Sequence, residues 1–377
     1  MATDRDFRKF DDALVAKLRE RIGKSTSPTK PQPFVTVATA DAIRHWAHAI
    51  GDYNPLYLDP DYAKEGPFGH LTGPPSMLYA FDKRANGGVS GLPGIHGLMG
   101  GCEWEWHRPI RELDEISADA AIASVEEREG EFAGRQLKIT SEVIFRDARG
   151  DVVGVSRPYG FRMERDAGRE KGKYEPKEPP YYTPEALDAI WDVMAAERPR
   201  GAQQRYYEDV SVGDALDRVV RGPITKSDFS VFTQGWGSQF VRAHGDWVRW
   251  VRRHPDGGIR NSFGVPEAAE AVHWDDEFAR LIGVPRAYDY GPQRISWMIT
   301  LLTNWMGDHG RLRRFQTQLR RPVMVADTVF VDASVSGKPP TGAGEGAVEV
   351  EIVTRNQDDE IVAKGGATVL LPVRGQA

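Results

Sequence analysis

The sequence predicts an α+β protein made of two similar halves, each a helix followed by long antiparallel strands. The first observation is a repeat at constant offset, in which the segment from Leu56 to Lys64 aligns with the segment from Val272 to Arg280. The aligned pairs are Tyr57 with His273, Asp59 with Asp275, Asp61 with Glu277, Tyr62 with Phe278, Ala63 with Ala279 and Lys64 with Arg280. A repeat of this kind indicates duplication of a whole structural unit.

The second observation is that further matches keep their order through both halves. Arg108-Pro109 followed by Asp114 recurs as Arg321-Pro322 followed by Asp327, and Arg146 with Asp151 recurs as Arg355 with Glu360. Upstream, the helical run at Asp41 matches the run at Asp228. Four matches in the same order favour a tandem duplication.

The elements follow in chain order. Residues 1–32 form a polar N-terminal arm, and residues 33–165 form the first domain, with a helix at Asp41–Ile50 whose apolar positions recur every three and four residues. Residues 166–204 form a charged, Pro-rich linker with one helix, which Thr183 and Pro184 begin as cap and first turn. Residues 205–377 repeat the plan, with an insertion at about 240–268 where the alignment offset changes.

Composition narrows the class of protein. The 377 residues carry a net charge of −6, which argues against nucleic-acid binding. Cys102 is the single cysteine, so an internal disulfide and a Cys-based metal cluster are excluded. The sequence has no secretory signal and no apolar run of the roughly 20 residues that span a bilayer. We therefore predict a cytoplasmic protein that binds neither nucleic acid nor membranes.

A resemblance appears at Gly51-Asp52-Tyr53-Asn54-Pro55-Leu56-Tyr57. This segment is similar to the G-D-x-N-P-x-H signature of the MaoC-like dehydratases, also called hydratase-2 enzymes, and Arg108-Pro109 and Arg321-Pro322 resemble the recurrent R-P strand start of that family. The resemblance extends over about 33–165 and 205–372. It implies tandem hotdog domains, a double hotdog, in which each antiparallel sheet wraps a central helix.

The resemblance also implies an activity. In that family the Asp and His of the signature add water reversibly to an enoyl thioester, usually an enoyl-CoA, without a metal. We therefore predict an enoyl-CoA hydratase, or 3-hydroxyacyl-CoA dehydratase in reverse, with no cofactor beyond the coenzyme A of its substrate. The expected partners are an acyl-CoA thioester and either a second copy of the chain or another hotdog protein.

The chain departs from the signature in both halves. The first half keeps Asp52 and Asn54 but has Tyr57 at the His position, whereas the second half keeps His273 and has Gln239 or Ala268 at the Asp position. His273 is the predicted general acid/base. Its proposed helpers are Asp246, which supplies a Gly-Asp within the insertion, and Gln239, which can orient water but cannot act as a base at neutral pH.

Five residues are predicted to bind substrate. Gly291 is the expected donor to the developing oxyanion, with Tyr290 lining the same pocket; Asp52, Asn54 and Tyr57 are binding residues of the first half, although Asp52 and Asn54 also suit turn stabilisation. Tryptophans at helix and strand spacing fit a core or, alternatively, a large apolar cavity for a bulky acyl group.

Two other functions remain open from the sequence. The incomplete Asp/His pair favours a degenerate hotdog protein that binds acyl thioesters or supports a complete subunit. A thioesterase shares the predicted fold. A carboxylate beside His273 within a pocket would favour the enzyme over the binding protein.

Overall fold

A computed structural model describes residues 11–26, 32–87, 92, 94–130, 134–164, 178–238, 241–339 and 345–375. Its centre is one nine-stranded sheet, in the order β4-β5-β6-β2-β10-β13-β12-β11-β7. The first half supplies β2 (His96–Trp106), β4 (Ile116–Gly130), β5 (Gly134–Asp147) and β6 (Val152–Met163). The second half supplies β7 (Val219–Arg221), β10 (Arg311–Leu319), β11 (Val329–Gly337), β12 (Glu345–Asn356) and β13 (Ile361–Pro372).

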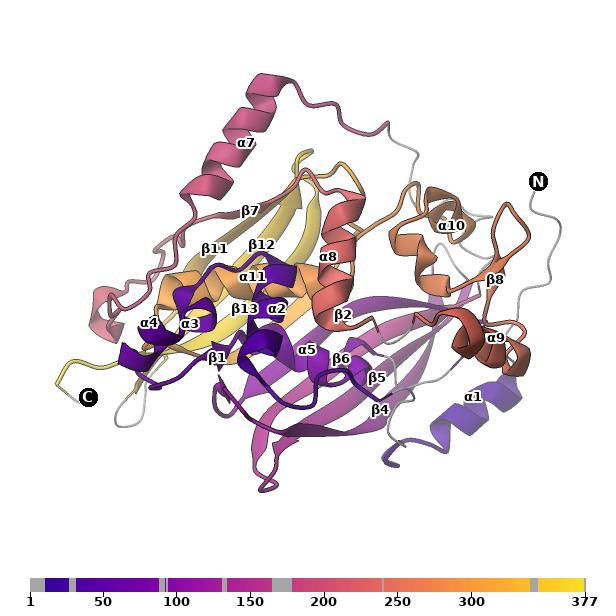
Figure 1. Cartoon of the computed structure of the whole chain (residues 1–377), viewed down its shortest axis with the longest axis horizontal. Coiled ribbons are helices and arrows are strands. Elements are labelled where there is room, and N and C mark those ends of the chain that lie inside the picture. Colours follow the sequence, from indigo (N-terminus) through magenta and orange to yellow (C-terminus); the bar gives the residue numbers. More distant parts are fainter. Residues whose placement is uncertain are drawn as a thin grey trace.

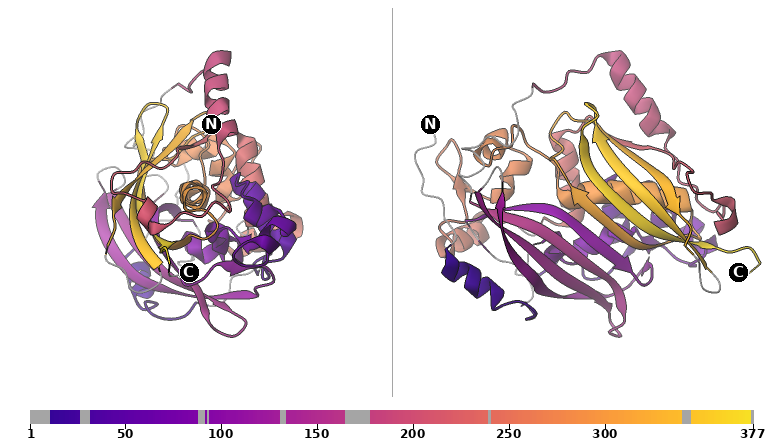
Figure 2. Two further views of the ribbon diagram at one scale, coloured as in Figure 1. Left: turned by 90° about the vertical axis from the view of Figure 1, so that its left-hand side faces the viewer. Right: turned by 180° about the vertical axis from the view of Figure 1, so that it is seen from behind.

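The two halves join edge to edge through β2 and β10. These strands pair antiparallel from Gly101 opposite Gln318 to Glu105 opposite Arg314. Figures 1 and 2 show the magenta strands of the first half beside the orange and yellow strands of the second half. The α+β double hotdog is thus confirmed, with the two expected sheets fused into one. Short strands pair outside this sheet: β1 (Thr72–Gly73) with β3 (Ile110–Arg111), and β8 (Ile259–Arg260) with β9 (Pro266–Glu267).

The central helix differs between the halves. In the second half it is α11 (Gly291–Met306), which is buried along almost its whole length and packs against β10, β11 and β13. Figure 2 (left) views α11 end-on beside the yellow strands. The first half has a broken counterpart: the 3-10 turns η1 (Pro75–Met77) and η2 (Lys83–Asn86) flank the four-residue α5 (Leu78–Phe81).

A second helical layer bridges the halves. Helix α2 (Ala40–Ile50) packs on α8 (Lys226–Trp236). The repeated Asp41 and Asp228 runs predict the two helices, but not this contact between them. The helices cross closely at Gly235, where a Cβ would overlap Ala49. Both end at a glycine with positive φ, Gly51 at 68° and Gly237 at 79°, a conformation that glycine adopts without steric cost.

The remaining helices are short or peripheral. They are α1 (Asp12–Arg19), α3 (Pro55–Leu58), α4 (Pro60–Glu65), α7 (Pro184–Ala196), α9 (His244–Arg253), α10 (Asp276–Leu281), and the 3-10 turns η3 (Tyr207–Asp209) and η4 (Ala269–His273). Helix α7 begins after its cap Thr183, as predicted, and buries none of its residues; it projects from the body in Figure 1. None of the described helices meets the length and hydropathy of a membrane span. The domain boundaries at 32, 165 and 204 stay predictions.

The sequence repeat corresponds to repeated structure. Asp59 caps α4 by accepting from the N–H groups of Asp61 and Tyr62, and Asp275 caps α10 by accepting from those of Glu277 and Phe278. The repeated aspartate therefore has a structural reason, since a carboxylate satisfies otherwise unpaired N–H groups at a helix start.

Candidate active site in the second half

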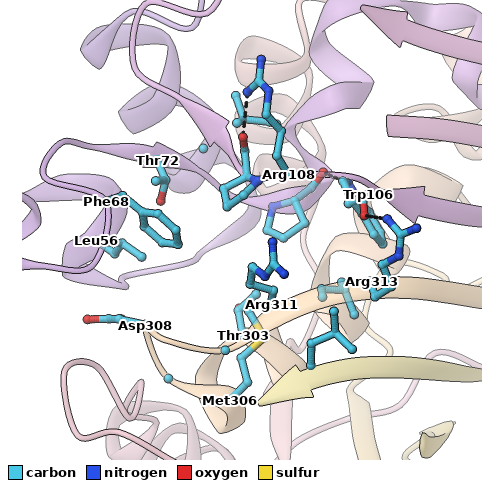
Figure 3. Close-up of a pocket in the computed structure, with 18 of the residues that line it drawn as sticks. Leu56, Phe68, Thr72, Trp106, Arg108, Thr303, Met306, Asp308, Arg311 and Arg313 are labelled. Carbon is cyan, nitrogen blue, oxygen red and sulfur yellow. Dashed lines mark hydrogen bonds between the residues drawn. The ribbon is translucent and has the colours of Figure 1, made fainter. Parts of the chain in front are cut away.

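Two cavities correspond to the two copies of the signature. The first-half cavity, of about 290 Å³, is lined by Asn54, Tyr57 and Gly73 together with Thr303 and Asp308 of the second half. Figure 3 shows this cavity, with Leu56, Phe68 and Thr72 across from Met306 and Asp308. The second-half cavity, of about 530 Å³, is lined by His273, Tyr290 and Gly291 together with residues of the first half such as Leu98, Met99 and Arg162. Each cavity therefore lies between the signature of one half and the strands or central helix of the other.

The polar signature residues of the first copy stabilise the turn and the contact between the halves. Asn54 Oδ1 accepts from the N–H of Leu56 at 3.0 Å and caps α3. Asp52 Oδ1 accepts from the N–H of Asn54 at 3.1 Å, and Asp52 Oδ2 accepts from the Thr300 hydroxyl of α11 at 3.1 Å. Asp52 is buried and does not line the cavity, so its contacts are structural.

Because Asp52 is buried, its ionisation should make the stability of the folded protein depend on pH. Desolvation raises its pKa from 3.8 to about 6, so between these values the folded protein holds a proton that the unfolded chain releases, and stability falls as pH rises. At about 1.4 kcal/mol per pKa unit, ionisation costs roughly 2–3 kcal/mol. We expect Asp52→Asn to gain stability relative to wild type between about pH 4 and pH 7, measured by urea unfolding. A difference in the free energy of unfolding between wild type and Asp52→Asn that does not change with pH would contradict this account.

Tyr57 does line the first-half cavity, but it cannot replace the imidazole of the signature. Burial, followed by the nearby charge of Asp52, raises the pKa of the Tyr57 phenol well above 10. The phenol is therefore neutral at physiological pH and has no basic form there. The geometry suits binding or packing rather than acid/base work at this position.

In the second copy, His273 ends η4, which packs with α10 into a small apolar core of its own that includes Val272, Phe278 and Tyr288. His273 Nδ1 lies 2.7 Å from the Tyr288 carbonyl oxygen. Because a carbonyl only accepts, Nδ1 carries the proton and Nε2 holds the lone pair. Burial lowers the pKa of His273 from 6.5 to about 4, which keeps this lone pair available at neutral pH.

Tyr290 and Gly291 lie beside this imidazole, as the sequence predicts. The Tyr290 ring stacks on His273 with centroids 3.7 Å apart, and its hydroxyl is buried without a hydrogen-bond partner in the described chain. Burial raises the pKa of Tyr290 well above 10, so the hydroxyl stays a donor.

Gly291 begins α11, where the backbone N–H groups of the first turn have no helical partners. A Cβ at Gly291 would lie 2.7 Å from Met99 Sδ. Glycine therefore keeps the backbone close to the cavity wall of the first half.

The structure does not bring Asp246, the first proposed helper, to His273. Asp246 lies in the first turn of α9 with a half-exposed side chain; its Oδ2 accepts from Arg242 at 2.7 Å, and it does not line the cavity. Gln239 lies outside the described residues, and Ala268 offers no carboxylate. The prediction for Asp246 is corrected, because its half-exposed carboxylate pairs with Arg242 and is not part of the cavity lining.

Glu270 is the carboxylate that sequence reasoning missed. It lines the same cavity as His273 and precedes it by three residues in η4. Side chains three apart on a 3-10 helix eclipse one another, so both lie on one face of this turn. At the constant offset of the repeat Glu270 aligns with Asn54, which is the signal that could have found it. Asp289 also lines the cavity, but Arg294 engages both of its oxygens at 2.5 and 2.7 Å.

Comparison with known proteins bears on the fold and on the class of reaction. Residues 27–154 match the family model described as "FAS1-like, dehydratase domain region". The chain is 30% identical over 179 residues to a probable enoyl-CoA hydratase alpha subunit of Thermomonospora curvata, covering 43% of this chain and 55% of that protein. It is 22% identical over 160 residues to the 3-oxo-4,17-pregnadiene-20-carboxyl-CoA hydratase alpha subunit of Mycobacterium tuberculosis, covering 38% and 51%. This chain thus spans about half the length of both relatives.

Other relatives are covered more fully. A UPF0336 protein of Streptomyces avermitilis is 30% identical over 114 residues, 29% of this chain and 73% of that one. A solved MaoC-like dehydratase superposes with a TM-score of 0.65 at 19% identity, covering 94% and 99% of the two chains. A Mycobacterium tuberculosis protein described as a double hotdog superposes with a TM-score of 0.54 at 11% identity, covering 92% and 96%. The chain has the double hotdog fold of these structures, and its residues 27–154 belong to the FAS1-like dehydratase domain family.

Proposed function

We propose that this protein adds water reversibly to an enoyl-CoA thioester in its second-half cavity, and dehydrates the 3-hydroxyacyl-CoA in the reverse direction. The observation that carries the proposal is a neutral His273, held in one tautomer by Tyr288, in a cavity that Glu270, Tyr290 and Gly291 also line. The hydratase names of two relatives support the reaction class.

The chemistry follows from what each group can do. His273 Nε2 takes a proton from the water that attacks C3, and its Nδ1–H bond to Tyr288 holds the tautomer in place. The carboxyl group of Glu270 is the second acid/base group, which delivers the proton to C2. The Tyr290 hydroxyl and the Gly291 N–H are the donors for the thioester oxygen, where negative charge develops in the enolate. Dehydration reverses each transfer.

The size and lining of the cavity bear on the acyl group. Its volume of about 530 Å³ lies within the range of drug-sized ligand sites, and Trp236, Trp247 and Trp250 line it. A bulky aromatic or polycyclic acyl group therefore suits it better than a short chain. A clear preference for short-chain enoyl-CoA would contradict this part of the proposal.

The "alpha subunit" names of two relatives support a further proposal about assembly. We expect a homodimer or a complex with another hotdog protein.

A second function is favoured by one observation: neither copy of the signature keeps both the Asp and the His. In that case the cavities bind acyl thioesters without turnover, and the chain supports a complete hydratase subunit.

Glu270→Gln separates the two functions. If Glu270 is the second acid/base group, its amide variant loses hydratase activity by about 10²-fold or more, measured as loss of the conjugated enoyl absorbance across a panel of enoyl-CoA thioesters. Asp246→Asn is the matched control, and we expect near wild-type rates from it. If Asp246→Asn lost hydratase activity and Glu270→Gln kept it, Asp246 rather than Glu270 would be the second acid/base group.

A further inference from the structure

The second-half cavity is lined by several cationic side chains, and most of its arginines have a partner. Arg242 pairs with Asp246 at 2.7 Å, Arg294 with Asp289 at 2.5 Å and Arg321 with Glu360 at 3.8 Å. Arg320 donates to Gln318 Oε1 at 2.7 Å. These contacts explain the positions of the four guanidinium groups without a ligand.

Arg162 differs from these arginines. It lies near the end of β6 and lines the same cavity. In the described chain its guanidinium makes one long hydrogen bond, from Nη2 to the Gly87 carbonyl oxygen at 3.4 Å, and has no carboxylate partner. A guanidinium offers five N–H donors, so most of those of Arg162 have no acceptor among the described residues. Burial alone lowers the pKa of Arg162, to about 10, which leaves the group positively charged at neutral pH.

The neighbouring strand leaves space for this guanidinium. Arg162 pairs with Gly97 of β2, and a Cβ at Gly97 would overlap the Nη1 and Cζ atoms of Arg162. The φ of Gly97 does not require glycine, so the missing side chain is explained by the position of the guanidinium. Arg162 is partly buried, and a charge that is partly removed from water without a counter-ion is unfavourable. A ligand anion in this cavity would supply the counter-ion.

We propose that Arg162 binds an anionic group of the ligand in the second-half cavity, either a carboxylate on the acyl group or a phosphate of coenzyme A. The choice of thioester ligands rests on the proposed function. A planar guanidinium binds carboxylate and phosphate through two parallel hydrogen bonds. Arg162 then determines which thioesters the cavity accepts, whereas His273 and Glu270 act on the enoyl group.

Calorimetric binding of saturated thioesters tests this without turnover. The first pair of probes is hexanedioyl-CoA, which ends in a carboxylate, and heptanoyl-CoA, which ends in a methyl group at a similar length. The second pair is heptanoyl-CoA and its 3′-dephospho analogue. Each is titrated into wild type, Arg162→Met, Arg162→Lys and Gly97→Ala. Gly97→Ala retains the charge and displaces the guanidinium, because the end of a flexible side chain yields before the strand does.

If Arg162 binds a carboxylate on the acyl group, we expect wild type to bind hexanedioyl-CoA more tightly than heptanoyl-CoA. We then expect Arg162→Met to lose about 10- to 100-fold in affinity for hexanedioyl-CoA and none for the other probes. If Arg162 binds the 3′-phosphate of coenzyme A, we expect the same loss for heptanoyl-CoA and none for its dephospho analogue, whereas a loss for both assigns Arg162 to the pyrophosphate. In either case we expect Gly97→Ala to lose affinity for the same probes as Arg162→Met. We expect Arg162→Lys to retain only part of the wild-type affinity for them. Equal affinities of wild type and Arg162→Met for every probe would overturn the inference, as would failure of all probes to bind.

The hydratase assay separates this result from the proposed function. Arg162-dependent binding without hydration of any enoyl-CoA supports the anion site and contradicts the enzyme. Hydration that is insensitive to Arg162 and to ligand charge supports the enzyme and contradicts the anion site.

Discussion

Replacing His273 by Ala is expected to lower kcat/KM for enoyl-CoA hydration by about 10²- to 10⁴-fold, the range for a lost general acid/base. The reason is that Nε2 of His273 holds an available lone pair at neutral pH, because burial lowers the pKa of the ring to about 4 and Nδ1 donates to Tyr288. The decline in absorbance of the conjugated thioester measures the rate.

The control for this variant is His48→Ala, which removes an exposed histidine of α2. We expect it to retain wild-type activity and the same unfolding temperature. If His273→Ala keeps full activity while remaining folded, the chemistry lies elsewhere, and Tyr57 with the first-half cavity becomes the alternative.

The second large effect concerns stability. Asp289 and Arg294 form an ion pair whose side chains are 1% and 3% exposed, and Asp289 also accepts from the N–H of Val323. Asp289→Ala leaves the Arg294 charge buried without its counter-ion, so we expect the free energy of unfolding to fall by about 3–5 kcal/mol. Chemical denaturation at neutral pH measures the loss.

Asp332→Ala is the matched comparison for this pair. Asp332 bonds Arg218 with a similar bidentate geometry, but the side chains are 40% and 52% exposed. An exposed pair of this kind contributes about 0–1 kcal/mol. Equal losses from the two variants would show that burial does not determine the energy of the Asp289 pair.

The sequence predicted the fold well because the duplicated residues have local structural reasons. Asp59 and Asp275 cap equivalent helices, and Asp114 and Asp327 each accept from the backbone N–H three residues earlier, at 2.7 and 2.8 Å. These hydrogen bonds join residues only a few positions apart, so they can be predicted from the spacing of residues in the sequence. The helices at Asp41 and Asp228 were predicted for the same reason.

Features that depend on distant residues were not predicted. The fusion of two sheets through β2 and β10 and the hydrogen bond of Asp52 to Thr300, 248 residues away, arise from packing between the halves. The broken central helix of the first half was also not foreseen.

The site was predicted in part. His273, Tyr290 and Gly291 line one cavity, as expected from the repeat. Asp246 was chosen because Gly245-Asp246 resembles the Gly-Asp of the signature, but the insertion places it in a helix where Arg242 is its nearer partner. Glu270 was overlooked because the family holds its carboxylate five residues before the histidine, whereas here it lies three residues before. No nearby sequence pattern marks Arg162 as a binding residue, because its guanidinium is accommodated by Gly97 on the neighbouring strand, which is distant in the sequence.

Mass spectrometry of the products formed from an enoyl-CoA in ¹⁸O-labelled water tests the central claim most directly. Our account predicts that the thioester survives and gains one labelled water molecule, with the label in the new hydroxyl group, and that His273→Ala abolishes this gain. Label in a released carboxylic acid, with free coenzyme A, would identify a thioesterase. Tight binding of the enoyl-CoA with no change in its mass would contradict the enzyme and support a degenerate binding subunit.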